Sequence, residues 1–383
     1  MTGNIYRPSE NARAWAEVDL SALKHNVAEL RSMLPRGCGI MAVVKANAYG
    51  LGLSRISECL QREGVGAYAI ATVEEGIELR ESGIEGEILV LGYTHPKYVK
   101  LLNDYRLAQL VADGAHAKAL DSAGQSIHVH VAVDTGLHRM GIDSSDFAAI
   151  ESLFNCDNMI VDGVATHLAS ADSLSENDAD FTRMQVEKFY AVVNALKAKG
   201  YDTGKLHIQA SYGIYNYSDV KCDYVRAGIA LHGAMGRVVD TNIKPALQPV
   251  LSLRARIAVV RFITAGESVS YGRTFTAAKP MKIATVSIGY ADGVPRQMSS
   301  NGGVCIVNGI KVPILGRICM DLLMADVTEI DSVAPGDVVT FIGKDGDEEI
   351  CCEDFAKAGG TITNDILCRL GLRLPRVYIN GGR

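Results

Sequence analysis

The sequence predicts an α/β protein in which a (β/α)8 TIM barrel is followed by a mostly β C-terminal domain. Three observations lead to this fold. Strand-like and helical stretches alternate eight times through the first two thirds of the chain. After about Pro249, short runs rich in Val and Ile are separated by Gly, Asp and Asn turns. The length of 383 residues exceeds one ordinary core, so two domains are expected.

The predicted barrel strands are apolar runs, and the stretches between them include helical periodicity over Val73–Ser82 and Ala179–Lys199. We expect the eight strands at Gly39–Lys45, Ala67–Ala71, Glu87–Leu91, Leu107–Ala112, Ile127–Asp134, Met159–His167, Lys205–Ala210 and Tyr224–Ile229. Eight alternations are typical of a (β/α)8 barrel, whose active sites lie at the C-terminal ends of the strands.

The second domain is predicted from six short strands, with helices only near its end at Asp354–Lys357 and Asn364–Leu370. The strands are expected at Leu251–Phe262, Met281–Ile288, Val304–Ile306, Lys311–Ile314, Leu322–Thr328 and Asp337–Ile342. We therefore place the barrel at residues 13–247 and the β domain at residues 248–383. Residues 1–12 are expected to pack with the β domain.

Composition excludes several classes of protein. The net charge of −6 and the absence of a Lys/Arg block argue against a nucleic-acid partner. The nine cysteines include no C-x-x-C pair, so neither a metal site nor a disulfide framework is predicted. A reducing cytoplasm fits this cysteine usage. No apolar run is long enough to span a bilayer, although the full-length protein could carry an upstream membrane domain.

Lys45 follows the apolar run Ile40–Val44 and precedes a turn of sequence Asn-Ala-Tyr-Gly. A lysine where a buried strand meets its loop is costly unless its charge is used or neutralised. Desolvation lowers a lysine's pKa, and the neutral amine forms Schiff bases with carbonyls such as pyridoxal phosphate. The alternative is a lysine whose ammonium reaches solvent at a strand end.

Other polar residues also end predicted strands, where the barrel would place an active site. Taken singly, each has an ordinary explanation, such as a core histidine or a salt bridge at the rim. Together on one end of the barrel they predict a shared site, formed by Lys45, Asp134 with the following Arg139, His167, Ser211 and Arg226.

With these residues in place, the chain resembles the alanine racemases, which are pyridoxal-phosphate enzymes of fold type III. The resemblance covers nearly the whole length, and the order and spacing of its motifs are specific. The matching segments are Ala14-Trp-Ala-Glu-Val-Asp-Leu, Val44-Lys-Ala-Asn-Ala-Tyr-Gly, Val133-Asp-Thr-Gly-Leu-His-Arg-Met-Gly, Thr166-His-Leu-Ala-Ser-Ala-Asp, Val225-Arg-Ala-Gly-Ile-Ala-Leu-His-Gly, Val269-Ser-Tyr-Gly-Arg-Thr-Phe, Ser287-Ile-Gly-Tyr-Ala-Asp-Gly and Gly316-Arg-Ile-Cys-Met-Asp.

The resemblance implies a role for each matching residue. Lys45 would be the Schiff-base lysine, and Lys45 and Tyr271 would be the two acid–base groups that racemisation requires on opposite faces of Cα. A homodimer is implied, in which Tyr271 and Met320 act in the partner's barrel. The resemblance further implies that the phosphate is bound by Tyr49, Ser211, Gly228 and Ile229. The cofactor ring would be contacted by His167 and Arg226. The substrate would be bound by Arg139, Met320, Tyr290 and Asn364, and Asn364 would also lie beside the cofactor.

Three positions depart from the family pattern. Ala132 replaces a lysine that many members carry as a carbamate beside the substrate-binding arginine. Ala210 replaces an asparagine of the phosphate site, and Asn364 replaces a tyrosine that lines the pocket. A smaller polar residue at 364 leaves room for a hydroxymethyl group and offers it a hydrogen bond.

The change at position 364 is similar to the racemase domain of the membrane-bound serine racemases of vancomycin-resistance clusters, which supply D-serine for peptidoglycan precursors. The resemblance therefore implies activity on serine and alanine. The alternative is an ordinary alanine racemase with neutral change at Asn364. A pyridoxal-phosphate carrier would lack the β domain, and a type III decarboxylase would place a glutamate where Arg226 stands.

Overall fold

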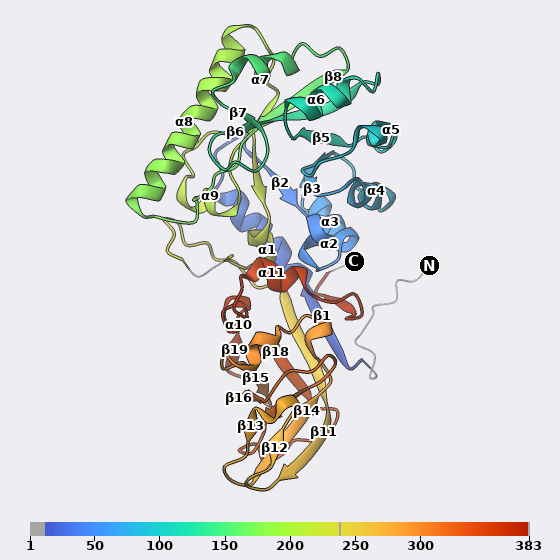
Figure 1. The fold of residues 1–383 in the computed structure, drawn as a ribbon, viewed down its shortest axis with the longest axis vertical. Helices are drawn as coiled ribbons and strands as arrows, with labels where there is room; N and C mark the ends of the chain where they lie inside the picture. The colour runs from blue at the N-terminus through green and yellow to red at the C-terminus, as the bar shows by residue number, and fades with distance from the viewer. Residues whose placement is uncertain (1–11, 237–238, 382–383) are drawn as a thin grey trace.

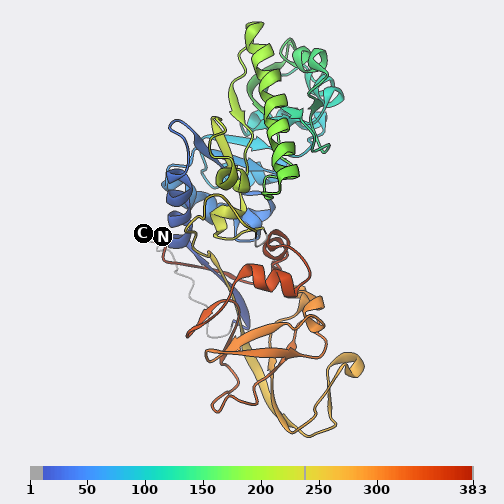
Figure 2. The ribbon, with the colours of Figure 1, turned by 90° about the vertical axis from the view of Figure 1, so that its left-hand side faces the viewer.

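The computed structural model describes residues 12–236 and 239–381. The protein has two lobes arranged end to end, a barrel lobe and a sheet lobe, which give it an elongated outline (Figures 1 and 2). The predicted fold, a TIM-like barrel followed by a mostly β domain, is confirmed.

The barrel lobe contains eight parallel strands in the order β10-β2-β3-β4-β5-β6-β8-β9. All eight predicted strands are present, and most are a few residues shorter than expected. They are β2 (Gly39–Val43), β3 (Ala67–Ile70), β4 (Glu87–Val90), β5 (Ala108–Val111), β6 (Ile127–Asp134), β8 (Met159–Ala165), β9 (Lys205–His207) and β10 (Tyr224–Ala227); the short β7 (Ile142–Asp143) pairs with β6.

The barrel nearly closes between β9 and β10. A parallel bridge joins Ala210 to Arg226 there, and the N–H of Arg226 donates to the carbonyl of Gln209 at 2.9 Å. The ends of two consecutive strands therefore meet at residues that include Arg226, which was predicted to be functional.

Helices surround this barrel, and Figure 1 shows the long α8 along its outer side. Both helices predicted between barrel strands are found, as α4 and α8. The barrel lobe contains α1 (Leu20–Ser32), α2 (Lys45–Tyr49), α3 (Leu53–Arg62), α4 (Val73–Glu81), η1 (Pro96–Tyr98), α5 (Val99–Asp104), α6 (Gly114–Asp121), α7 (Phe147–Leu153), α8 (Glu176–Ala198), α9 (Ser211–Asn216) and η2 (Ile229–His232).

The sheet lobe is built on a nine-stranded sheet of order β19-β18-β15-β16-β17-β14-β11-β1-β20. All neighbours in it are antiparallel except β1 and β20. Its strands are β1 (Ala14–Asp19), β11 (Leu251–Ile263), β14 (Met281–Val286), β15 (Val304–Val307), β16 (Ile310–Leu315), β17 (Leu323–Asp326), β18 (Val338–Asp345), β19 (Glu348–Ile350) and β20 (Arg376–Ile379), with a separate pair β12 (Ser268–Val269) and β13 (Phe275–Thr276). Its helices are η3 (Tyr271–Arg273), η4 (Tyr290–Asp292), η5 (Arg296–Ser299), α10 (Cys352–Ala358) and α11 (Thr363–Cys368).

One segment lies in a different lobe from the one expected. Residues 14–19 were placed in the barrel, but they form β1, whose register pairs Ala16 with Leu253 of β11 and with Arg376 of β20. These partners are more than 200 residues away, so local periodicity does not reveal them. The expectation for residues 1–11 concerns a segment outside the described residues, whereas the carbonyl of Ala12 accepts a hydrogen bond from Arg256 of β11 at 3.1 Å.

A single apolar core runs through both lobes and fixes their relative position. It includes Leu23 and Ile88 in the barrel lobe together with Phe341 and Ile366 in the sheet lobe, all fully buried. The last helices of the sheet lobe, α10 and α11, return to the barrel, where α11 packs against α2 (Figure 1). This contact brings the C-terminal segment to the strand ends of the barrel.

Candidate active site

A cavity of about 600 Å³ opens at the C-terminal ends of the barrel strands. The fold brings together here the residues that the sequence marked at separate strand ends. The predicted residues that line it are Lys45, Tyr49, Asp134, Arg139, His167, Ser211, Arg226, Gly228, Ile229 and Asn364. Barrel topology thus gathers the groups from Lys45 to Ile229, and the sheet lobe adds Asn364.

Lys45 follows β2 and begins a left-handed segment. Residues 46–49 have φ between 50° and 56°, although none of the four is glycine. Two side chains hold the segment: the N–H of Ala46 donates to Glu75 Oε1 at 2.6 Å, and Asn47 Oδ1 accepts from the N–H of Leu53 at 2.8 Å. Backbone outliers of this kind cluster at functional sites, where the surrounding structure enforces them.

The electrostatic surroundings of Lys45 favour a neutral amine. Burial lowers the pKa of Lys45, and the positive charge of Arg139 lowers it further. No ion pair or hydrogen bond engages the Lys45 side chain within the part of the chain that the structure describes. A lowered pKa increases the fraction of unprotonated amine, which is the nucleophilic form.

An anion cradle lies beside Lys45, formed by Tyr49, Ser211 and the start of η2. Ser211 Oγ accepts from the N–H groups of Gly228 at 3.2 Å and Ala230 at 3.4 Å, while the N–H of Ile229 has no partner among the described residues. A Cβ at Gly228 would lie only 2.4 Å from Tyr49 Oη, so glycine keeps this approach open. Convergent hydroxyl and N–H donors suit a phosphate group.

Arg226 is buried, and both of its terminal nitrogens are engaged. Nη1 donates to His207 Nδ1 at 2.8 Å and to the His207 carbonyl at 2.6 Å; Nη2 lies 2.7 Å from the Thr166 carbonyl and 3.0 Å from His167 Nδ1. Nε is the one guanidinium nitrogen without such a bond among the described residues. Burial lowers the pKa of Arg226 to about 10, which leaves the group charged at neutral pH. A donor of this kind fits the expected contact with a pyridine nitrogen.

Arg139 lines the cavity without an ion pair or hydrogen bond among the described residues. Ala132, where the family pattern has a lysine, also lines the cavity and offers no polar group. The guanidinium is therefore free to bind an anionic ligand group, such as a carboxylate.

Asn364 reaches the cavity from the other lobe. It lies in the first turn of α11, and its Oδ1 would be 3.2 Å from a Cβ built on Gly236. The neighbouring Thr363 N–H donates to the Gly236 carbonyl at 3.3 Å. Asn364, which was predicted to control substrate size, thus lies at the edge of the cavity.

Three predicted residues lie elsewhere. Tyr271, Met320 and Tyr290 belong to the sheet lobe, are 69%, 52% and 42% exposed, and do not line the cavity of their own chain. One chain therefore does not bring them to Lys45. Their exposure is compatible with a role in the cavity of a second subunit.

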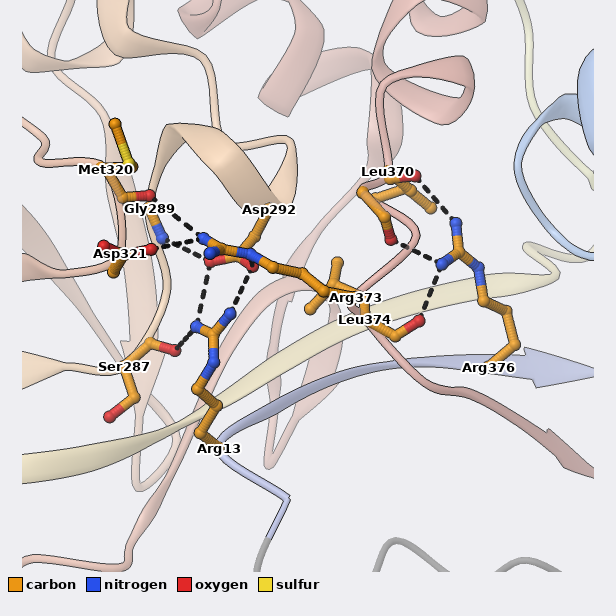
Figure 3. A network of polar contacts seen from close by, with 11 residues as sticks. Arg13, Ser287, Gly289, Asp292, Met320, Asp321, Leu370, Arg373, Leu374 and Arg376 are labelled. Atoms are coloured by element: carbon orange, nitrogen blue, oxygen red, sulfur yellow. Dashed lines mark hydrogen bonds and ion pairs between the residues drawn. The ribbon is translucent and has the colours of Figure 1, made fainter.

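A buried carboxylate holds the loops that carry Tyr290 and Met320 (Figure 3). Asp292 is fully buried and pairs with Arg13 at 2.6 Å and Arg373 at 2.7 Å. The Tyr290 N–H donates to the Cys319 carbonyl at 3.0 Å, and Arg373 also pairs with Asp321 beside Met320 at 2.7 Å. The two exposed side chains therefore project from a fixed surface.

Sequence reasoning missed several cavity residues, of which His207 is the clearest. It ends β9, is fully buried and contacts Arg226 directly. The same signal that marked His167, a polar residue in a buried barrel strand, applied to it. Asp172, Tyr212 and Gly236 also line the cavity; Asp172 and Gly236 lie outside helices and strands, and Tyr212 lies in the short helix α9.

Over residues 12–236 and 239–381 there is no cluster of His, Cys, Asp and Glu that could hold a metal ion. In the same ranges no helix is long and apolar enough to cross a membrane.

Buried histidines are expected to make the protein lose stability in mild acid. Burial lowers the pKa of His167 to about 3 and that of His232 to about 4, and it lowers the pKa of His207 well below its usual range. Between about pH 4 and 6.5 the unfolded chain therefore binds more protons than the folded one. The free energy of unfolding should fall as pH falls through this window, by up to about 1.4 kcal/mol per pH unit per histidine, and be insensitive to these groups above it.

The contribution of His232 to this loss of stability can be measured separately, because neither of its ring nitrogens has a hydrogen-bond partner among the described residues. His232→Phe removes the titration without removing a hydrogen bond. Denaturant unfolding at half-unit pH steps should give this variant a shallower loss of stability between pH 6.5 and 4.5 than the parent. If stability falls equally steeply with pH in the variant and the parent, His232 does not contribute to the acid sensitivity.

Both domains of the chain match those of a known protein family. Residues 18–236 match the alanine racemase N-terminal domain, and residues 250–378 match the alanine racemase C-terminal domain. The chain is 40% identical over 367 residues to an amino-acid racemase of Enterococcus faecalis and 36% identical over 366 residues to a serine/alanine racemase of Enterococcus gallinarum. These alignments cover 96% and 95% of this chain but 52% and 51% of the relatives, so the chain spans about half of their length.

Solved structures agree with this result. The alanine racemase from Bacillus anthracis with bound L-Ala-P is similar with a TM-score of 0.90 and 31% identity, over 99% of this chain and 97% of that one. A cavity at the strand ends of a parallel barrel, joined to an antiparallel sheet lobe, defines a class of two-domain barrel enzymes. Within that class, the chain belongs to the alanine racemase family.

Proposed function

We propose that the protein is a pyridoxal-phosphate-dependent racemase that interconverts the L and D forms of serine and alanine. The observation that carries the proposal is the convergence in one cavity of a desolvated lysine, an anion cradle and a buried arginine donor. These groups match the aldehyde, the phosphate and the ring nitrogen of the cofactor.

The bound cofactor would make the Cα proton of an amino acid removable, because its ring accepts the carbanion's electrons. Lys45 would hold or return the proton on one face of Cα. Arg226, charged and donating from Nε, would leave the ring nitrogen unprotonated, since a guanidinium hardly gives up its proton. Arg139, without a protein anion beside it among the described residues, would orient the substrate carboxylate.

The second face requires another acid–base group, for which we propose Tyr271 of a partner subunit. Tyr271 is exposed on the sheet lobe and absent from the cavity of its own chain. A homodimer in which Tyr271, Tyr290 and Met320 complete the partner's cavity would satisfy both facts. The fixed loops around Asp292 support such a surface, because a catalytic group must be held in position.

Serine is proposed as a substrate because Asn364 provides space and a hydrogen-bonding amide at the cavity edge. The serine/alanine racemase of Enterococcus gallinarum is one of the relatives that supports this choice. The product would then be D-amino acid for peptidoglycan precursors in the cytoplasm, in a vancomycin-resistance setting. An upstream membrane domain in the full-length protein is proposed with it, since the Enterococcus relatives are about twice as long.

An ordinary alanine racemase is the second candidate, favoured by the match to the Bacillus anthracis structure over nearly its whole length. Chiral chromatography of the products formed from L-serine and L-alanine, with added pyridoxal phosphate, separates the two. Both D-serine and D-alanine are expected. Formation of D-alanine alone would support the second candidate, and formation of neither would contradict both.

Asn364→Tyr is expected to shift preference from serine toward alanine. The ring would fill the space for the hydroxymethyl group and remove the amide that bonds its hydroxyl. Loss of a buried hydrogen bond costs on the order of 1–3 kcal/mol, so the ratio of kcat/KM for L-serine to that for L-alanine should fall about ten- to hundredfold. Steady-state kinetics with both substrates measure this ratio.

Ile362→Tyr provides the matched control, because Ile362 lies two residues earlier and is 46% exposed. It adds the same ring near α11 but does not line the cavity. The control should keep the parent ratio. An unchanged ratio in Asn364→Tyr would remove Asn364 as the determinant of serine use.

A further inference from the structure

Four polar side chains form a line through the interior of the barrel. Arg226 Nη1 lies 2.8 Å from His207 Nδ1, His207 Nε2 lies 2.8 Å from His130 Nδ1, and His130 Nε2 lies 2.9 Å from Glu87 Oε1. The last of these approaches is an ion-pair contact, since neither His130 Nε2 nor Glu87 Oε1 has a hydrogen-bond partner among the described residues. The contacts join four different strands, β10, β9, β6 and β4.

This line connects the two ends of the barrel. Arg226 and His207 line the candidate active site, whereas Glu87 lines a second cavity of about 730 Å³ at the N-terminal ends of the strands. His130 between them is fully buried. Gly163 on the adjacent β8 makes room for it, because a Cβ there would lie 2.6 Å from His130 Nδ1.

The chemistry of the two end groups fixes where the protons lie. A guanidinium can only donate, so His207 Nδ1 must accept and the ring proton of His207 must be on Nε2. That N–H donates to His130 Nδ1, so His130 in turn carries its proton on Nε2. A carboxylate can only accept, and the Glu87 carboxylate lies 2.9 Å from the nitrogen that carries this last proton. If His130 were protonated on Nδ1, the chain would reverse and His207 would present an N–H to the guanidinium.

We infer that Glu87 is a positioning residue that acts through His130 and His207 on Arg226. By attracting the His130 Nε2 proton across the 2.9 Å ion-pair contact, it favours one direction for the hydrogen bonds of the two histidines and keeps the lone pair of His207 Nδ1 directed at Nη1. The guanidinium is then held with Nε as its remaining donor toward the cavity. Any effect on catalysis through the contact of Arg226 with the cofactor ring rests on the proposed function. The positions of the protons on the two histidines do not depend on it.

The Glu87 carboxylate also acts on Tyr224 of β10. Burial raises the pKa of Tyr224, and the nearby Glu87 carboxylate raises it further. Tyr224 precedes Arg226 by two residues on β10, so Glu87 contacts the same strand at its other end.

The test compares Glu87→Gln with Glu87→Leu in the full chain labelled with 15N histidine. Glutamine keeps an acceptor oxygen, whereas leucine has a similar size and none. Two-bond 1H–15N spectra should show the parent His130 and His207 protonated on Nε2, with the His130 N–H protected from solvent exchange. Glu87→Gln should keep both features, and Glu87→Leu should lose the protection of the His130 N–H. Thermal unfolding of each variant shows that it is folded.

Activity gives an independent measure if the proposed function holds. Glu87→Leu should lower kcat for racemisation by about tenfold with little change in KM, and Glu87→Gln should stay within about twofold of the parent. Should Glu87→Leu not fold, neutron diffraction from deuterated crystals of the parent still locates the ring deuterons. A deuteron on His130 Nδ1, or an unchanged His130 signal in folded Glu87→Leu, would overturn the inference even if the chain racemises amino acids.

Discussion

Replacing Lys45 with alanine is expected to abolish racemisation and the yellow colour of the cofactor-loaded protein. Among the described residues Lys45 is the one lysine that lines the cavity; it lies beside an anion cradle, and its pKa is lowered first by burial. Losing both the covalent attachment and one acid–base group should reduce kcat/KM by at least about 10³-fold, because general acid–base catalysis alone contributes 10²–10⁴-fold. Absorbance spectra and racemisation assays in both directions measure the two effects.

Two controls sharpen this experiment. Lys45→Arg keeps a positive charge but provides no nucleophile, so it should be as inactive as the alanine variant. Lys279→Ala removes an exposed lysine of the sheet lobe and should behave like the parent. Substantial racemisation by Lys45→Ala without added amine would contradict the role of Lys45.

Tyr271→Phe is expected to lower racemisation by about 10²- to 10⁴-fold while leaving proton exchange on one face. The change removes only a hydroxyl from a side chain that is 69% exposed, so the fold should be unaffected. Lys45 should still exchange the Cα proton of one enantiomer with solvent. Deuterium incorporation into each enantiomer, followed by mass spectrometry, distinguishes the faces, and equal losses for both would remove the support for two separate groups.

The same two variants test whether the site is shared between subunits. If Tyr271 acts in the partner's cavity, a mixed dimer of Lys45→Ala and Tyr271→Phe contains one cavity with both residues intact. Mixing the inactive variants should therefore restore part of the activity. No recovery despite subunit exchange, shown with differently tagged chains, would mean that each cavity is complete within one chain.

The barrel could be predicted because its signals are local. Each buried strand is a short apolar run, and most parallel neighbours follow each other along the chain after a helical stretch, so periodicity and order suffice. The strands that escaped prediction depend on distant partners or are very short. β1 pairs with β11 and β20 at the far end of the chain, while β12 and β13 have two residues each.

The cavity could be predicted in part, and for a physical reason. Barrel topology places every strand end on one rim, so polar residues after buried strands converge whatever their spacing. That rule found Lys45, His167 and Arg226 and applied equally to His207. It says nothing of Glu87 and His130, whose importance depends on which atoms face each other across the interior.

The left-handed segment after Lys45 has a thermodynamic consequence. L-amino acids in this conformation cost about 1–2 kcal/mol each, so residues 46–49 together cost about 4–8 kcal/mol, which is comparable to the net stability of a domain. The continuous core and the anchors at Glu75 and Asn47 must offset this sum in every folded molecule. Glycine at these positions would relieve the strain, because it has no Cβ to clash in the left-handed region, but it would also make the segment that aims the lysine more flexible. Substitutions that raise the free energy of unfolding without loss of activity should therefore be found elsewhere in the barrel.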